Sequence, residues 1–61
     1  MAGREVLFEI TRVGNCVKVT AFDTRTLVEV SMVASPAATE AHLKAAALRK
    51  LDYVLAKKAK G

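Results

Sequence analysis

The chain has few of the residues that hold small domains together or carry out chemistry. Its 61 residues include one cysteine, one histidine, one proline and no tryptophan. One cysteine excludes an internal disulfide, and one histidine with one cysteine cannot complete a four-ligand zinc site. Chains below about 70–80 residues usually depend on such a staple or on oligomerisation. We therefore expect self-association as a homodimer, and we expect no metal or other cofactor.

The chain also lacks a long apolar run near its start. The first ten residues, MAGREVLFEI, include the charged Arg4, Glu5 and Glu9, which is not typical of a signal peptide or of a membrane span. A single unpaired cysteine suits a reducing compartment. These features predict a cytoplasmic protein that is not embedded in a membrane.

Apolar residues are abundant, at 52% of the chain, and they follow two patterns. Up to residue 34, Val, Ile, Phe and Thr are interrupted by turn residues, which is typical of strands. The pair Gly14-Asn15 predicts a two-residue hairpin turn between strands over 5–13 and 16–23. A second turn centred on Thr24-Arg25 predicts a third strand over 27–34, with Phe22 opposite Leu27.

The two predicted turns agree on how the side chains divide between the faces of a sheet. Because side chains alternate along a strand, this register collects only apolar residues on one face. That face contains Val6, Phe8, Ile10, Val17, Val19, Ala21, Val28, Val30 and Met32. We expect a three-stranded antiparallel meander with the strand over 16–23 in the centre.

After residue 34 the apolar period changes to that of a helix, predicted over residues 36–59. Ser35 is a candidate N-cap with Pro36 at the first helical position, and Thr39 is a second candidate. An apolar stripe along this segment contains Leu43, Ala47, Leu48, Leu51, Val54 and Leu55, and it matches the apolar sheet face. The prediction is an α+β fold of two layers, βββα. It forms one domain over residues 1–61, with residues 57–61 as a frayed basic tail.

The second face of the predicted sheet carries apolar residues that the helix does not cover. They form two groups at opposite ends of this face: Leu7, Phe22 and Leu27, and Val13, Cys16 and Val33. Apolar patches of this kind indicate an interaction surface, and a second copy about a two-fold axis is the simplest cover. The alternative is scattered exposed apolar residues, which are normal in proteins.

The net charge of +4 lies entirely in the C-terminal segment. Residues 1–35 hold four basic and four acidic residues, whereas residues 36–61 hold six basic and two acidic residues. Four bases of the predicted helix are candidate contacts for nucleic acid or another polyanion: Arg49, Lys50, Lys57 and Lys58. Bases near a helix C-terminus also stabilise the helix dipole, so a purely structural role is the alternative.

No catalytic set can be assembled from the sequence. Cys16 has only one lysine near it on the predicted strand, and it is interpreted as a small side chain that fills a β position. His42 has no acid or histidine three or four residues away, so it is interpreted as a solvated side chain. Glu9 and Glu29 are both expected opposite Thr20, as edge charges that oppose aggregation. The sequence predicts no enzyme, unless a partner chain completes a site.

The runs REVLFEITRVGN and LRKLDYVL, with the acid- and threonine-bearing second turn between them, resemble short bacterial proteins of unknown function. The resemblance implies a bacterial cytoplasmic protein, and it implies no activity and no site residue. Our hypothesis is a small non-enzymatic interaction module that self-associates through the helix-free face and could also bind an unidentified protein. Binding of nucleic acid or another polyanion through the basic end of the helix is the alternative.

Overall fold

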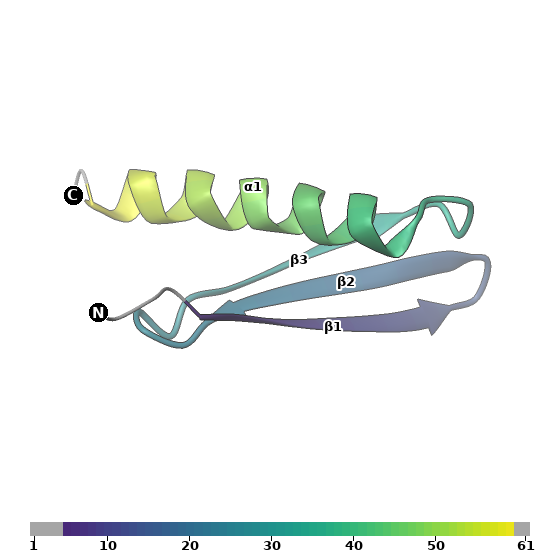
Figure 1. Ribbon diagram of the computed structural model, residues 1–61, viewed down its shortest axis with the longest axis horizontal. Helices are drawn as coiled ribbons and strands as arrows, with labels where there is room; N and C mark the ends of the chain where they lie inside the picture. Colours follow the sequence, from purple (N-terminus) through teal and green to yellow (C-terminus); the bar gives the residue numbers. More distant parts are fainter. Residues whose placement is uncertain (1–4, 60–61) are drawn as a thin grey trace.

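The computed structural model describes residues 5–59 and arranges them in two layers (Figure 1). Strands β1 (Val6–Val13), β2 (Cys16–Asp23) and β3 (Glu29–Ala34) form an antiparallel sheet in that order. Helix α1 (Glu40–Ala59) follows β3 and lies on one face of the sheet. The predicted βββα architecture is therefore confirmed.

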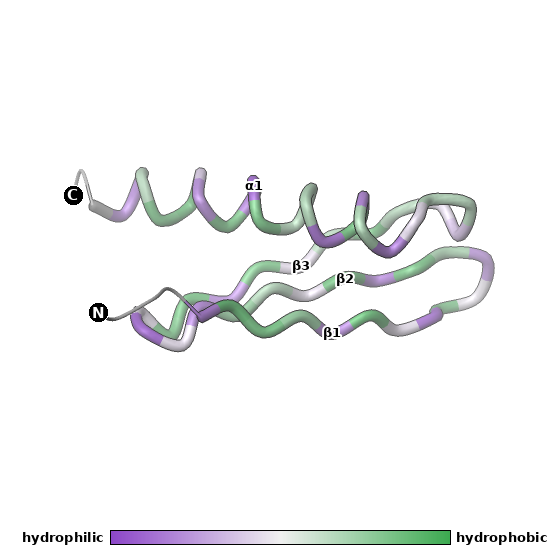
Figure 2. The backbone as a smooth tube through the Cα atoms, in the orientation of Figure 1, coloured by the Kyte–Doolittle hydropathy of each residue, from purple (hydrophilic) through white to green (hydrophobic). Residues whose placement is uncertain are grey.

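The hairpin between β1 and β2 follows the predicted register. Gly14 takes a φ of 60°, which glycine adopts without steric cost. Val13 lies opposite Cys16, and Ile10 lies opposite Val19. Apolar and polar residues alternate over residues 8–11 of β1 and 17–21 of β2, as the changing colour along both strands shows (Figure 2). The pleat sends these residues to opposite faces of the sheet.

The predicted register between β2 and β3 was wrong by two residues. Phe22 lies opposite Glu29 rather than Leu27, because Thr24–Leu27 form a longer loop and β3 begins at Glu29. Both common two-residue hairpin turns need positive φ at the first central position, here Thr24, which a β-branched residue disfavours. The observed loop needs positive φ only at Leu27, where φ is 63°.

The carboxylate of Asp23 stabilises this longer loop. Its Oδ1 accepts the backbone N–H of Arg25 at 2.8 Å and that of Thr26 at 3.3 Å. An aspartate that bonds to the backbone two residues ahead is a recognised turn former. The shift of two residues is even, so it leaves every β3 side chain on its predicted face.

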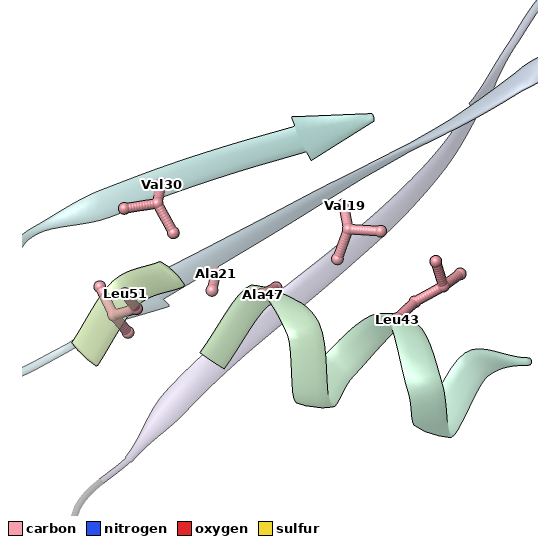
Figure 3. Close-up of a cluster of buried hydrophobic side chains, with 6 residues drawn as sticks. All are labelled: Val19, Ala21, Val30, Leu43, Ala47 and Leu51. Atoms are coloured by element: carbon pink, nitrogen blue, oxygen red, sulfur yellow. The ribbon is translucent and has the colours of Figure 1, made fainter. Parts of the chain in front are cut away.

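The core lies between the sheet and α1 (Figure 3). Its buried side chains come from β2, β3 and the apolar stripe of the helix: Val19, Ala21, Val30, Leu43, Ala47 and Leu51. All six were assigned to the helix–sheet contact from the sequence. Half-buried residues at the margin, including Phe8, Met32 and Leu55, enlarge this core.

Helix α1 begins later than predicted, at Glu40 instead of residue 36. Thr39 is the N-cap, since its Oγ1 accepts the N–H of His42 at 3.1 Å. Ser35 instead closes a separate turn, in which its Oγ accepts the N–H of Ala37 at 3.1 Å. The second candidate cap is thus the one in use, and Pro36 lies in the turn before the helix.

The helix covers the sheet unevenly. It contacts β2 and β3, and β1 lies farthest from it (Figure 1). The helix reaches β1 through Lys44, whose Nζ lies 5.9 Å from the centre of the Phe8 ring. The uneven cover leaves Ile10, on the helix side of β1, 38% exposed.

The C-terminal part of α1 includes Lys57 and Lys58 and ends at Ala59. The predicted frayed tail extends to residues 60 and 61, which lie outside the described residues, and fraying stays a prediction. Within residues 5–59, no helix is long and apolar enough to cross a bilayer.

Replacement of Leu51 by alanine should destabilise the fold strongly. Leu51 is fully buried, and truncation of a buried leucine costs about 2–5 kcal/mol. Urea unfolding followed by circular dichroism measures the loss. Leu27→Ala is the matched control, because the same atoms are removed from a side chain that is 71% exposed. Similar losses in both variants would contradict this description of the core.

The two serine and threonine caps should differ in their contribution to stability. Thr39→Ala removes the helix N-cap and should cost about 1 kcal/mol. Ser35→Ala removes a bond in an exposed turn and should cost less than about 0.5 kcal/mol. Thermal unfolding of both variants measures the two losses of stability. A larger loss for Ser35→Ala would indicate that Ser35, rather than Thr39, is the N-cap of the helix.

Candidate interaction surfaces

The helix-free face of the sheet consists of cross-strand rows that the corrected β3 register defines. One row contains Leu7, Phe22 and Glu29, and the next contains Glu9, Thr20 and Ser31. A third contains Thr11, Lys18 and Val33, and Val13 lies beside Cys16 at the far end. The face therefore keeps two apolar contacts, Leu7 with Phe22 and Val13 with Cys16. Both lie between β1 and β2.

The β3 side of this face is more polar than the sequence predicted. Glu29 takes the place beside Phe22 that was assigned to Leu27. Leu27 lies in the loop before β3 with 71% of its surface exposed, and Val33 lies opposite Lys18. The structure thus brings together Leu7 with Phe22 and Val13 with Cys16, and it separates Leu27 and Val33 from both pairs.

The middle of this face is a polar row. Thr20 is 9% exposed although it lies on the face of the sheet that the helix does not cover. Its Oγ1 lies 3.4 Å from the Oγ of Ser31. Glu9 lies opposite Thr20, but Glu29 lies opposite Phe22. The expectation that both glutamates flank Thr20 was wrong, because it depended on the earlier register.

The remaining chemistry-bearing side chains are dispersed. Cys16 is an exposed free thiol at the start of β2, and His42 is exposed in the first turn of α1. Within residues 5–59, no three His, Cys, Asp or Glu side chains lie close enough to hold a metal ion. The same part of the chain has no pocket.

The four candidate bases of α1 are all exposed but have different surroundings. Lys50 Nζ donates a 2.8 Å hydrogen bond to the carbonyl of Ser31 on β3. Lys57 Nζ lies 5.6 Å from the centre of the Tyr53 ring. Arg49 and Tyr53 are four residues apart, as are Tyr53 and Lys57, so these three share one side of the helix.

Sequence reasoning missed the role of Lys50 at the sheet edge. The signal was present, because Lys50 flanks the apolar stripe and a lysine in that position can reach past the buried face. What the sequence did not show was which strand lies on that side of the helix. Its partner, Ser31, follows from the position of α1 over β2 and β3.

The outer strand β1 is the other feature that the sequence did not single out. Three large apolar side chains are exposed on it: Leu7 at 52%, Ile10 at 38% and Val13 at 57%. Ile10 was assigned to the covered face of the sheet. Its exposure follows from the position of the helix, which the strand pattern does not determine.

These features define a two-layer βββα domain with an apolar outer strand and a helix that is basic along one side. The chain belongs to the family described as Domain of unknown function (DUF6898), whose model matches residues 3–58. This membership agrees with the resemblance to proteins of unknown function. No curated protein and no solved structure matches the chain. The family description names no activity.

Proposed function

We propose that this domain is a non-enzymatic interaction module that self-associates, with the β1 side of the sheet in the interface. One observation carries the proposal. Residues 5–59 expose six large apolar side chains, and three of them, Leu7, Ile10 and Val13, lie on β1. Apolar surface gathered on one element of so small a domain favours association over solvation.

The β2 neighbours of these residues extend the proposed interface. Phe22 lies beside Leu7, and Cys16 lies beside Val13. The proposal is narrower than the one from the sequence, since Leu27 and Val33 are separated from these pairs. A non-enzymatic role is supported by the dispersal of Cys16, His42 and Glu9 over different elements. The resemblance and the exposed free thiol support a bacterial cytoplasmic setting.

Self-association should be visible as a dimer mass in size-exclusion chromatography with light scattering at micromolar concentration. Leu7→Glu should shift the protein towards monomer, because it places a charge in the proposed interface. Val33→Glu is the matched control, since Val33 is also exposed on the same face, at 66% against 52% for Leu7, but lies on β3. A monomeric wild-type protein at about 100 μM, where even weak dimers form, would refute self-association. Equal dissociation by both variants would refute the β1-sided interface.

A second candidate function is binding of single-stranded nucleic acid or another polyanion by α1. The observation that favours it is the exposed Tyr53 with a base one helical turn to each side, Arg49 and Lys57. Single-strand binders combine aromatic stacking groups with cations that track the phosphates. Lys58 adds charge next to Lys57, whereas the ammonium of Lys50 is bonded to β3.

This second function predicts salt-sensitive binding of a fluorescent single-stranded oligonucleotide, measured by anisotropy. Affinity should fall about twentyfold between 50 and 200 mM salt, because about three phosphate contacts release bound counterions from the strand. Lys57→Gln should weaken binding, whereas Lys44→Gln should not, since Lys44 lies at the other end of α1 and pairs with Glu40 at 3.0 Å. Absence of binding at 50 mM salt, or equal effects of both substitutions, would exclude this candidate.

A further inference from the structure

We infer that two copies of the chain join along the outer edge of β1, in antiparallel register with Ile10 opposite Ile10 of the second copy. The inference rests on the proposed self-association and specifies its geometry. Two three-stranded sheets become one six-stranded sheet, and a two-fold axis perpendicular to the sheet keeps both helices on the same side.

Alternate residues of β1 direct their backbone groups away from the sheet. The carbonyl of Glu5 accepts the N–H of Thr24 at 3.2 Å, so Glu5 and its odd-numbered successors bond towards β2. In an antiparallel pair such residues alternate with ones that do not bond across the ladder. Phe8, Ile10 and Arg12 therefore point their N–H and C=O groups outward, where a further strand can bond to them.

The opposite edge of the sheet is occupied. The N–H of Asp23 donates to the carbonyl of Val28 at 2.9 Å, so the same alternation turns the backbone groups of Ser31 outward from β3. Lys50 Nζ bonds to the Ser31 carbonyl at 2.8 Å, in the middle of a six-residue strand. Lysine and short length are devices that protect edge strands from pairing.

The edge strand β1 carries no lysine and is not short, and its charged residues are Glu9 and Arg12. The strand has eight residues. No hydrogen bond from residues 5–59 reaches the outward N–H and C=O groups of Phe8, Ile10 and Arg12. Both of its sides are exposed over Glu9–Val13. A further strand can therefore pair with β1, whereas Lys50 blocks pairing along β3.

Charge and the cover of apolar side chains favour one register of β1 over its two neighbours. Residues opposite each other must lie on the same face of the sheet. The two-fold axis therefore passes midway between one residue of β1 and the same residue of the second copy. An axis at Glu9 would oppose two like charges, which is destabilising. An axis at Thr11 would pair Leu7 with Asn15 of the hairpin turn and leave its side chain uncovered. The axis at Ile10 avoids both defects.

This register pairs the exposed apolar residues of β1 with one another. Leu7 lies opposite Val13 of the second copy on the helix-free face, and the two Ile10 side chains meet on the helix side. Phe8 lies opposite Arg12 of the second copy, where a guanidinium can stack on the ring. One strand thus complements itself, which favours a second copy over an unrelated strand as the occupant.

Hydrogen exchange of the wild-type protein, followed by NMR, tests the edge pairing. At a concentration where about nine-tenths of the chains are paired, the amides of Phe8, Ile10 and Arg12 should exchange about tenfold more slowly than in the dilute, unpaired protein. The reason is that only the unpaired tenth of the chains leaves these amides open to exchange. The outward amides of Ser31 and Val33 on β3 are the internal control and should not change with concentration.

Single cysteines in a Cys16→Ser background test the register. In the inferred register the two residues 10 are opposite each other, with Cα atoms about 5.5 Å apart, within the range for a disulfide. Two residues 9, or two residues 11, are diagonal neighbours at about 7–8 Å, outside that range. Under mild oxidation, Ile10→Cys should therefore form covalent dimers about tenfold faster than Glu9→Cys or Thr11→Cys.

The outcomes separate this inference from the proposed function. A wild-type monomer in light scattering would overturn both. A dimer whose outward β1 amides stay unprotected would overturn the edge pairing and leave self-association intact. Protected amides with faster cross-linking of Glu9→Cys or Thr11→Cys would overturn the Ile10 register. Protection of β1 together with fastest cross-linking at residue 10 supports the inference as stated.

Discussion

The structure depends on the contact between α1 and the centre of the sheet. Val19 and Ala21 of β2 and Ala47 of α1 are fully buried, and two of these three side chains are single methyl groups. Small side chains let a helix approach a sheet closely, and close packing fixes where it lies. Leu43 and Leu51, one helical turn to either side of Ala47, complete the buried line along the helix (Figure 3). The position of α1 over β2 and β3 follows from this contact.

The position of the helix sets the character of both sheet edges. Because α1 reaches β3, Lys50 can bond to the outward carbonyl of Ser31 and cover that edge. Because α1 lies away from β1 (Figure 1), Ile10 stays exposed and the other edge stays open. The same packing that stabilises a single copy of the domain leaves it with one protected edge and one open edge. The proposed association thus follows from how a single helix covers three strands.

The sequence predicted the fold because both of its signals are local. Gly14-Asn15 fixes the first register through its own backbone preferences, and strand alternation then assigns the faces. The helical stripe from Leu43 to Leu55 needs only its own period to show which side is buried. The second turn was misjudged because Asp23 captures the amides of Arg25 and Thr26. Whether the loop is short or long depends on the geometry of these side-chain hydrogen bonds. The presence of turn-forming residues does not specify that geometry.

The candidate surfaces were predicted only in part, for a different reason. The pairs Leu7 with Phe22 and Val13 with Cys16 were predicted correctly because the first hairpin alone positions them. Leu27 and Val33 were grouped with them through the β3 register, and the two-residue shift separated them. By itself the sequence determined the two layers, the two faces and the core, since these follow from periodicity along one chain. Only the tertiary structure decided the longer loop, the bond of Lys50 to β3 and the exposure of Ile10. Those features depend on the side-chain geometry of one loop and on where the helix lies across the sheet, a packing choice that no local pattern encodes.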